Sequence, residues 1–203
     1  MKKLKKLKFG SSSWDFQSDQ IQLYAFWNNA FSKEECQAIT NIAKNKGLIE
    51  GKIGIQNGVK SDVRVRESNI SWLYPNDDMD WVFRRVTDIT LNLNEKFFKF
   101  DLFGINEGFQ FTNYKAPSGK YGKHVDRGLN IPVRKLSMSI QLTNPEEYEG
   151  GELYLYTTDK GDLMDKTQGT LILFPSYVLH EVTPVTKGER NSLVTWVTGK
   201  QFK

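Results

Sequence analysis

His124, Val125 and Asp126 form the stretch of this chain that is best suited to chemistry. Residues two apart on an extended strand point to the same side, so the imidazole of His124 and the carboxylate of Asp126 are expected to project into one cavity. The only other histidine, His180, occupies a second apolar, strand-like stretch far downstream. The three side chains together offer two imidazoles and one carboxylate, which are ligands suited to a metal ion.

Two histidines and one carboxylate leave open coordination positions on the metal they bind. This arrangement is expected of a non-haem Fe(II) site, because the vacant positions accept a co-substrate and O2. The alternative is that both histidines are buried, hydrogen-bonded core residues and that the His-x-Asp pattern arises by chance. The motifs around these residues favour the metal site.

Length and composition set the broad class of the protein. A chain of 203 residues is long enough for one domain with a full core. Its net charge of +4 comes from the five lysines of Met1–Lys8, without which the net charge would be −1. We therefore expect a solvated basic terminus, with a nucleic-acid arm as the alternative, and no basic face over the fold.

Location follows from what the sequence lacks. No apolar run approaches membrane-spanning length and the N-terminus lacks the apolar core of a secretory signal, so we expect a soluble, cytoplasmic protein without a membrane partner. Cys36 is the only cysteine, which excludes an intrachain disulfide and agrees with a reducing compartment. We expect Cys36 to be a small buried hydrophobic residue on a helix.

Two helices are predicted in the N-terminal half. Ser32 and Glu35 have the spacing of a capping box, and Gly47 is a suitable end for the helix that follows. A second helix is predicted to open at Asn76-Asp77-Asp78 and to run to Phe97 on an apolar stripe of helical spacing. Between them we expect a loop from Gly51 leading into a short strand over Val63–Arg66.

From Gly108 onward the hydrophobic period changes to two, which is typical of strands. Strands are predicted at 109–114, 121–126, 136–142, 153–156, 169–174, 181–184 and 191–199, with a polar loop over 157–168. Short strands after helices predict an α+β, mainly β fold: a double-stranded β-helix, or jelly roll, with helices packed on one side. We expect one domain over residues 1–203, with a flexible basic segment over 1–20 and the jelly-roll core over 100–199.

The order of the motifs resembles a known family. The motifs are Tyr114, Tyr121-Gly122-Lys123-His124-Val125-Asp126, Tyr148-Glu149-Gly150-Gly151-Glu152-Leu153, Gly169, Phe174-Pro175, His180-Glu181-Val182-Thr183-Pro184-Val185, Arg190 and Trp196. Together they resemble the prolyl 4-hydroxylase superfamily of Fe(II)/2-oxoglutarate-dependent dioxygenases. The resemblance covers Gly108 to the C-terminus well, and Ser61–Leu73 with the first helix more loosely.

The resemblance implies a role for each matching residue. His124, Asp126 and His180 would hold Fe(II), and Arg190 would bind the distal carboxylate of 2-oxoglutarate, for which a guanidinium fork is suited. Tyr114 matches a tyrosine that binds the co-substrate, and Trp196 matches an aromatic residue near the metal. Tyr121 would stand at the pocket mouth. A core position remains the alternative for these aromatic residues, and a solvent-exposed position for Arg190.

The resemblance also implies the reaction, which consumes 2-oxoglutarate and O2 at Fe(II) and hydroxylates a C–H bond while releasing succinate and CO2. A requirement for ascorbate stays open. Related halogenases replace the carboxylate ligand, so Asp126 favours hydroxylation. Nucleic-acid dealkylases carry a second arginine where this chain has Trp196, and collagen-type prolyl hydroxylases have lysine at the place of Arg190.

We therefore expect hydroxylation of a peptidyl residue, with proline favoured and a peptide or protein as substrate. A nucleic-acid demethylase and a jelly-roll binding module without catalysis are the two alternatives. Arg64 and Arg66, which share one face of the predicted short strand, either meet an anionic substrate or backbone carbonyls, or lie on a solvated edge.

Overall fold

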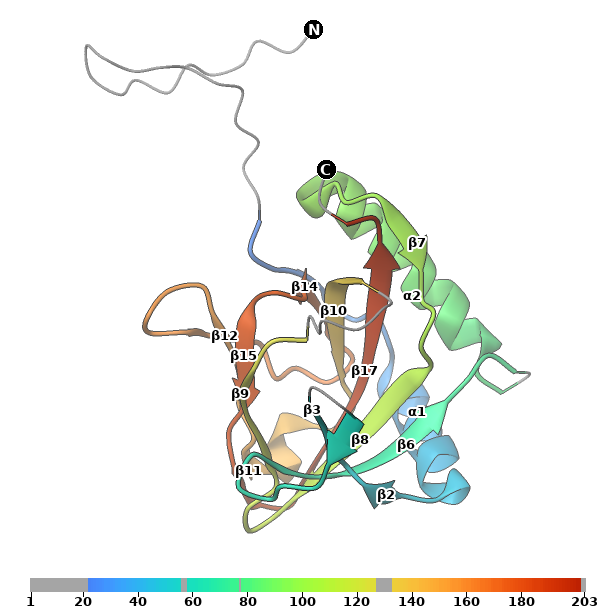
Figure 1. Ribbon diagram of the computed structural model, residues 1–203. Helices are drawn as coiled ribbons and strands as arrows, with labels where there is room; N and C mark the ends of the chain where they lie inside the picture. The colour runs from blue at the N-terminus through green and yellow to red at the C-terminus, as the bar shows by residue number, and fades with distance from the viewer. Residues whose placement is uncertain (1–21, 56–57, 77, 127–132, 202–203) are drawn as a thin grey trace, which may run out of the picture.

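The computed structural model describes residues 22–55, 58–76, 78–126 and 133–201 (Figure 1). Two β-sheets face each other, and both helices lie on one side of the larger sheet. This is the mainly β architecture predicted from the sequence. The basic segment predicted over residues 1–20 lies outside the described residues. No helix in the described ranges is long and apolar enough to cross a membrane.

The larger sheet is formed in the described part of the chain by β1 (Ala25–Trp27), β2 (Ile49–Glu50), β6 (Asn69–Leu73), β7 (Leu102–Gly104), β8 (Phe109–Lys115), β10 (Arg134–Gln141), β14 (Leu171–Pro175) and β17 (Glu189–Gly199). Its order is β1-β14-β10-β17-β8-β6-β2, and β7 pairs with the end of β17. β10, β17 and β8 are long neighbouring strands near its centre, and they form the floor of the space between the sheets.

The smaller sheet has the order β13-β12-β15-β9-β5. Its strands are β5 (Arg66–Glu67), β9 (Lys120–His124), β12 (Leu153–Tyr156), β13 (Asp162–Leu163) and β15 (Leu179–Val182). Two short two-stranded sheets complete the described strands, β3 (Ile53–Ile55) with β4 (Gly58–Lys60) and β11 (Glu149–Gly150) with β16 (Val185–Lys187). All strand pairings are antiparallel.

The first helix, α1 (Lys33–Lys46), confirms the predicted capping box. The Ser32 hydroxyl accepts the backbone N–H of Glu35 at 3.2 Å, and the Glu35 carboxylate accepts the backbone N–H of Ser32 at 2.8 Å. Two amides that the first turn leaves free are thereby satisfied. Gly47 follows the helix with φ 100°, a value that favours glycine. Cys36 is fully buried on this helix, as predicted.

The second helix, α2 (Asp80–Leu93), begins later than its predicted start at Asn76. The Asn76 side-chain oxygen accepts the backbone N–H groups of Asp78 and Met79, at 3.2 and 3.1 Å, in a turn that precedes the helix. Asparagine stabilises turns in this way, so the polar residues end the preceding segment before the helix starts. A π-helical turn, η1 (Asn94–Phe98), then extends α2.

The alternation along β8 separates two environments. Phe109 and Phe111 are fully buried in the core between the large sheet and the helices. Gln110, Thr112 and Tyr114 point the other way and line the pocket between the sheets. Because successive side chains of a strand point to opposite faces, one strand supplies both the core and the site.

The region from Gly51 to Arg66 differs from its prediction. The expected loop contains the β3–β4 pair, and Val63–Val65 form a turn, so that the smaller sheet begins only at Arg66. The polar loop over 157–168 also contains the short strand β13. These strands are only two or three residues long, which is too short for a pattern in the sequence to mark them.

Candidate active site

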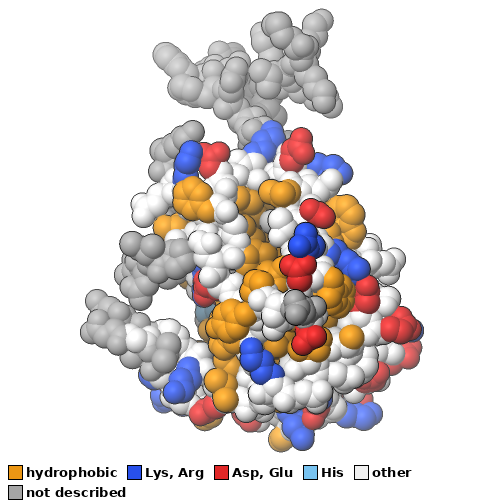
Figure 2. All heavy atoms as spheres, turned by 90° about the vertical axis from the view of Figure 1, so that its right-hand side faces the viewer, with side chains coloured by type: hydrophobic (Ala, Val, Ile, Leu, Met, Phe, Trp, Pro, Cys, Tyr) orange, Lys and Arg blue, Asp and Glu red, His pale blue; other side chains and the backbone are white. Residues whose placement is uncertain are grey.

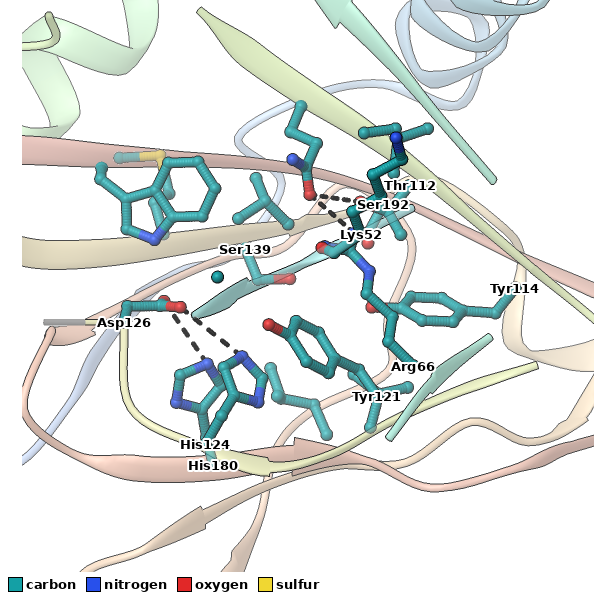
Figure 3. Close-up of a pocket in the computed structure, with 18 of the residues that line it drawn as sticks. Lys52, Arg66, Thr112, Tyr114, Tyr121, His124, Asp126, Ser139, His180 and Ser192 are labelled. Atoms are coloured by element: carbon teal, nitrogen blue, oxygen red, sulfur yellow. Dashed lines mark hydrogen bonds and ion pairs between the residues drawn. The ribbon is translucent and has the colours of Figure 1, made fainter. Parts of the chain in front are cut away.

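His124, Asp126 and His180 meet between the two sheets (Figure 3). His124 ends β9, and the pairing of β9 with β15 places it directly opposite His180. The strand predicted over 121–126 ends at His124, and Asp126 lies in the bend that follows, where its N–H donates to the Ser176 carbonyl at 3.0 Å. Both side chains nevertheless face the same site, as predicted.

The geometry of the three side chains fits a metal ion. His124 Nε2 lies 3.5 Å from Asp126 Oδ1, and His180 Nε2 lies 3.4 Å from Asp126 Oδ2. One ligand atom from each residue can be chosen so that all lie within 4.8 Å of one another. Ligand atoms about 2.1 Å from a common metal are separated by roughly 3 to 3.5 Å at angles of 90 to 110°.

Both imidazoles are oriented by the backbone. Nδ1 of His124 lies 2.7 Å from the Gly122 carbonyl, and Nδ1 of His180 lies 2.9 Å from the Val178 carbonyl. A carbonyl only accepts, so each Nδ1 carries a hydrogen and each Nε2 is the atom that faces Asp126. A hydrogen on Nε2 can bond to the carboxylate in the metal-free protein, and a bound metal ion would take its place. Protein metal sites usually fix their histidines by such a second hydrogen bond.

The electrostatics of the site favour an ionised carboxylate. Burial alone would raise the pKa of Asp126, but the positive charge that His180 can carry and hydrogen bonds from both imidazoles hold that pKa well below its usual range. Burial would lower the pKa of His180, whereas the Asp126 carboxylate raises it above the usual value. An ionised, buried carboxylate beside two imidazoles is prepared for a cation.

Aromatic rings hold the two imidazoles in place. The Tyr121 ring is stacked on His124, with ring centroids 3.6 Å apart and planes inclined by 17°. Phe174 contacts His180 edge to face, with centroids 4.9 Å apart. Burial raises the pKa of Tyr121 to about 12, so its hydroxyl remains a neutral hydrogen-bond donor. Tyr121 therefore lines the pocket, and it also packs against a candidate metal ligand.

Arg190 supplies a buried cation in the same pocket. Its side chain is 2% exposed, and its Nη2 donates to Gln141 Oε1 at 2.9 Å. Its Nη1 is buried without a hydrogen-bond partner among the residues that the structure describes. The guanidinium carbon lies 5.5 Å from the centroid of the Tyr114 ring, which is also buried. An unsatisfied N–H of a buried cation fits an anionic ligand at this end of the pocket.

Trp196 lies on the same face of β17 as Arg190, six residues away. At about 3.3 Å per residue, the two positions are roughly 20 Å apart along the strand, so they serve opposite ends of the pocket. Trp196 is buried, and its Nε1 has no hydrogen-bond partner among the described residues. Its ring packs near Trp72, with centroids 6.2 Å apart.

Arg134 was not singled out by the sequence, since nothing in its spacing marks it. Its guanidinium carbon lies 3.6 Å from the centroid of the Trp196 ring. Arg134 Nε donates to the Glu107 carboxylate at 2.6 Å and its Nη1 donates to the backbone carbonyl of Asp126 at 3.3 Å. Arg134 thus connects a candidate metal ligand with the tryptophan end of the pocket.

Arg66 and Arg64 do not share an environment, contrary to the prediction that they lie on one strand face. The Arg64 side chain is 86% exposed and paired with Asp62, whereas Arg66 is 6% exposed and lines the pocket. Arg66 donates through Nε to Ser68 Oγ at 2.8 Å, through Nη1 to the Lys52 carbonyl at 3.1 Å and through Nη2 to Gln110 Oε1 at 2.8 Å. Alternation alone could not show which arginine turns inward.

The pocket that joins these groups has a volume of about 450 Å³. All of the residues predicted for the site line it, namely Tyr114, Tyr121, His124, Asp126, His180, Arg190 and Trp196. Figure 2 shows a small area in the histidine colour at the left-hand edge of the view. The space suffices for a small co-substrate together with part of a larger substrate.

Comparison with known sequences decides the family. A profile described as the 2OG-Fe(II) oxygenase superfamily matches residues 109–198. A PKHD-type hydroxylase of Aliarcobacter butzleri (strain RM4018) is 31% identical over 173 residues, which make up 82% of this chain and 74% of the relative. The chain belongs to the 2OG-Fe(II) oxygenase superfamily. A PKHD-type hydroxylase of Prochlorococcus marinus (strain NATL2A) is 30% identical over 174 residues, which make up 84% of this chain and 76% of that relative.

Solved structures of the superfamily share the fold. A Pseudomonas putida prolyl-4-hydroxylase has a TM-score of 0.70 at 20% identity, covering 88% of this chain and 94% of that one. A Trichoplax adhaerens prolyl hydroxylase, in complex with a hypoxia inducible factor peptide fragment, has a TM-score of 0.72 at 21% identity, covering 87% and 84%. The predicted jelly roll and the predicted membership of the prolyl 4-hydroxylase superfamily are confirmed. The enzyme is a 2-oxoglutarate- and Fe(II)-dependent dioxygenase that uses O2.

Proposed function

We propose that this dioxygenase hydroxylates a proline residue of a peptide or protein, and that His124, Asp126 and His180 hold its Fe(II). The observation that carries the proposal is the convergence of two imidazole Nε2 atoms on one buried carboxylate. The same pocket contains the Nη1 of Arg190, which has no hydrogen-bond partner among the described residues. The donor set fits Fe(II), since two imidazoles and a carboxylate leave positions open. When bound, iron and 2-oxoglutarate supply oxidative decarboxylation to succinate and CO2 and the insertion of one oxygen atom into a C–H bond.

The protein's own part begins with orientation of the metal ligands. The Gly122 and Val178 carbonyls fix the imidazoles through Nδ1, so that His124 and His180 present Nε2 without rotation. Arg134 restrains the backbone at Asp126 through its carbonyl. A ligand set that is oriented before the metal arrives requires little reorganisation on binding.

The opposite end of the pocket orients the co-substrate. Arg190 presents Nη1 to the distal carboxylate of 2-oxoglutarate, while Gln141 holds Nη2 and thereby fixes the plane of the guanidinium. Tyr114 closes the pocket beside it, and its burial raises the pKa of the phenol, which stays protonated as a donor. In a site this buried the charged hydrogen bonds are strong and water is excluded.

A prolyl substrate fits the end of the pocket near Trp196. The rings of Trp72 and Trp196 offer apolar surface suited to a pyrrolidine ring, beside the Arg134 guanidinium that covers one face of Trp196. The Nε1 of Trp196, which has no partner among the described residues, can donate to a peptide carbonyl. The relatives support this assignment, because they are named PKHD-type hydroxylases and one structural neighbour holds a peptide. We place the single catalytic domain over residues 1–203, with its jelly-roll core over 100–199.

The test is an assay for succinate with labelled 2-oxoglutarate, Fe(II) and ascorbate, run with proline-containing peptides and with methylated DNA. We expect succinate formation to be stimulated by peptides and the peptide to gain 16 Da on proline, with His124→Ala inactive. Stimulation by methylated DNA alone would overturn the proposal in favour of oxidative demethylation. Omission of ascorbate from parallel reactions determines whether it is required.

A further inference from the structure

Arg66 is a buried cation whose charge the described protein does not neutralise. Its three hydrogen bonds go to a hydroxyl, a backbone carbonyl and a side-chain amide, all of which are neutral. No carboxylate of the described residues forms an ion pair with it. A guanidinium has five N–H donors, so two remain beyond the three that are used. A buried charge without a counter-ion is costly, which indicates a partner that is not part of the chain.

Arg66 lies close to the candidate metal site. Its guanidinium carbon is 4.6 Å from the centroid of the Tyr121 ring, and that centroid is 3.6 Å from the centroid of the His124 ring. The guanidinium carbon is therefore no more than about 8 Å from the His124 ring. Figure 3 shows Arg66 and Tyr121 on the side of the pocket away from Asp126. A group bound to Arg66 would therefore lie in the same pocket as the candidate metal ligands.

The other charges of the pocket balance without Arg66. Glu107 pairs with Arg134, and Fe(II), the Asp126 carboxylate, the dianion of 2-oxoglutarate and Arg190 sum to zero. Two further charged groups line the pocket, the exposed Lys52 and the exposed Glu50, and their opposite charges cancel. Glu50 accepts a hydrogen bond from Ser61, and it is not among the three acceptors of Arg66. With iron and co-substrate in place, the pocket carries one uncompensated positive charge, at Arg66.

On the basis of the proposed function, we infer that Arg66 selects substrates that carry a carboxylate next to the residue that is hydroxylated. The carboxylate can be the side chain of an acidic neighbour of proline or the α-carboxylate of a C-terminal proline. Both present the same chemistry to a guanidinium fork with two free N–H groups. Neutral proline-rich sequences are then poor substrates.

The experiment compares matched acids and amides while 2-oxoglutarate is saturating, so that Arg190 is occupied. One arm uses peptides with proline beside Asp or Asn, and a second uses peptides ending in proline as the free acid or the amide. A third arm replaces the proline peptides with N-acetyl-leucine and N-acetylphenylalanine, each as the free acid and as the amide. For each ligand we measure kcat/KM from succinate, and also Kd by calorimetry with Zn(II) in place of iron, which needs no turnover.

The wild-type enzyme is expected to prefer acids over amides by at least about tenfold in one of the arms, a difference of about 1.4 kcal/mol. Arg66→Gln should reduce that ratio to near one while leaving the Kd for 2-oxoglutarate unchanged. Arg64→Gln, which alters an exposed arginine two residues away, should keep the ratio of the wild-type enzyme.

Three results would overturn the role of Arg66. The first is equal use of acids and amides by the wild-type enzyme, and the second is an acid preference that survives Arg66→Gln. The third is an equal fall of kcat/KM for acids and for amides in that variant, which would indicate that Arg66 binds a neutral carbonyl. The first of these needs no variant and so does not depend on whether Arg66→Gln folds. An Arg66-dependent preference for acids without any activity on proline would support Arg66 and overturn the proposed prolyl substrate.

Discussion

Replacement of Arg190 tests how the pocket binds 2-oxoglutarate. The side chain is 2% exposed and its Nη1 has no acceptor among the described residues, so the distal carboxylate would be its one charged partner. Removing one member of a buried, hydrogen-bonded charge pair costs about 3 to 5 kcal/mol. At about 1.4 kcal/mol per factor of ten, Arg190→Gln is expected to weaken 2-oxoglutarate binding by roughly two to three and a half orders of magnitude.

The conservative variant separates charge from shape. Arg190→Lys retains the positive charge but loses the planar fork that Gln141 orients, so we expect a loss of about tenfold, smaller than that of the glutamine variant. The assay is calorimetric titration of the Zn(II)-loaded protein with 2-oxoglutarate, with Arg64→Gln as the control. A Kd for Arg190→Gln within a few fold of the wild-type value would refute the reasoning and would indicate that another cation binds the distal carboxylate.

Three further predictions concern the site and its supports. In the metal-free protein, the pKa of Asp126 is lowered and that of His180 is raised. The ion pair between them therefore stabilises the fold above the usual carboxyl pKa, and this stabilisation is lost as pH rises through the pKa of His180. The melting temperature should therefore fall on Asp126→Asn at pH 6 and differ less at pH 9; a difference that grows with pH would contradict this. Gly151→Ala should destabilise the protein and weaken 2-oxoglutarate binding, because Gly151 has φ +63° and an added Cβ would lie 2.9 Å from Arg190 Cδ. An unchanged calorimetric Kd for 2-oxoglutarate would argue against this. Ser32→Ala should cost about 1 kcal/mol, a shift of roughly 2 to 4 °C in melting temperature, by loss of the helix cap.

Local patterns in the sequence predicted the elements whose cause is local. The capping box at Ser32 depends on residues three apart, and the alternation of β8 divides core from pocket within a single strand. The pairing of His124 with His180 depends on the register of β9 and β15, which no local pattern contains. Its prediction rested on the resemblance to the family and on the scarcity of histidine in the chain.

Two arginines owe their place in the pocket to tertiary structure: Arg66, whose direction the sequence left open, and Arg134, which the sequence did not mark. Arg66 turns inward because β5 joins the smaller sheet there and Gln110 on the facing sheet supplies an acceptor. Arg134 becomes part of the pocket because Glu107, 27 residues earlier, binds its guanidinium. Arginines with structural and functional roles have the same local sequence signature, so composition and periodicity cannot separate them.

The most direct test of the metal site is an anaerobic titration with Fe(II), followed by calorimetry, of the wild-type chain and of His124→Ala, Asp126→Ala and His180→Ala. The convergence of these three side chains predicts one Fe(II) per wild-type chain and a large loss of Fe(II) affinity in each variant. Circular dichroism should show that each variant keeps its fold. Stoichiometric binding of Fe(II) with unchanged affinity by any one of the three variants would contradict the assignment of that residue as a ligand.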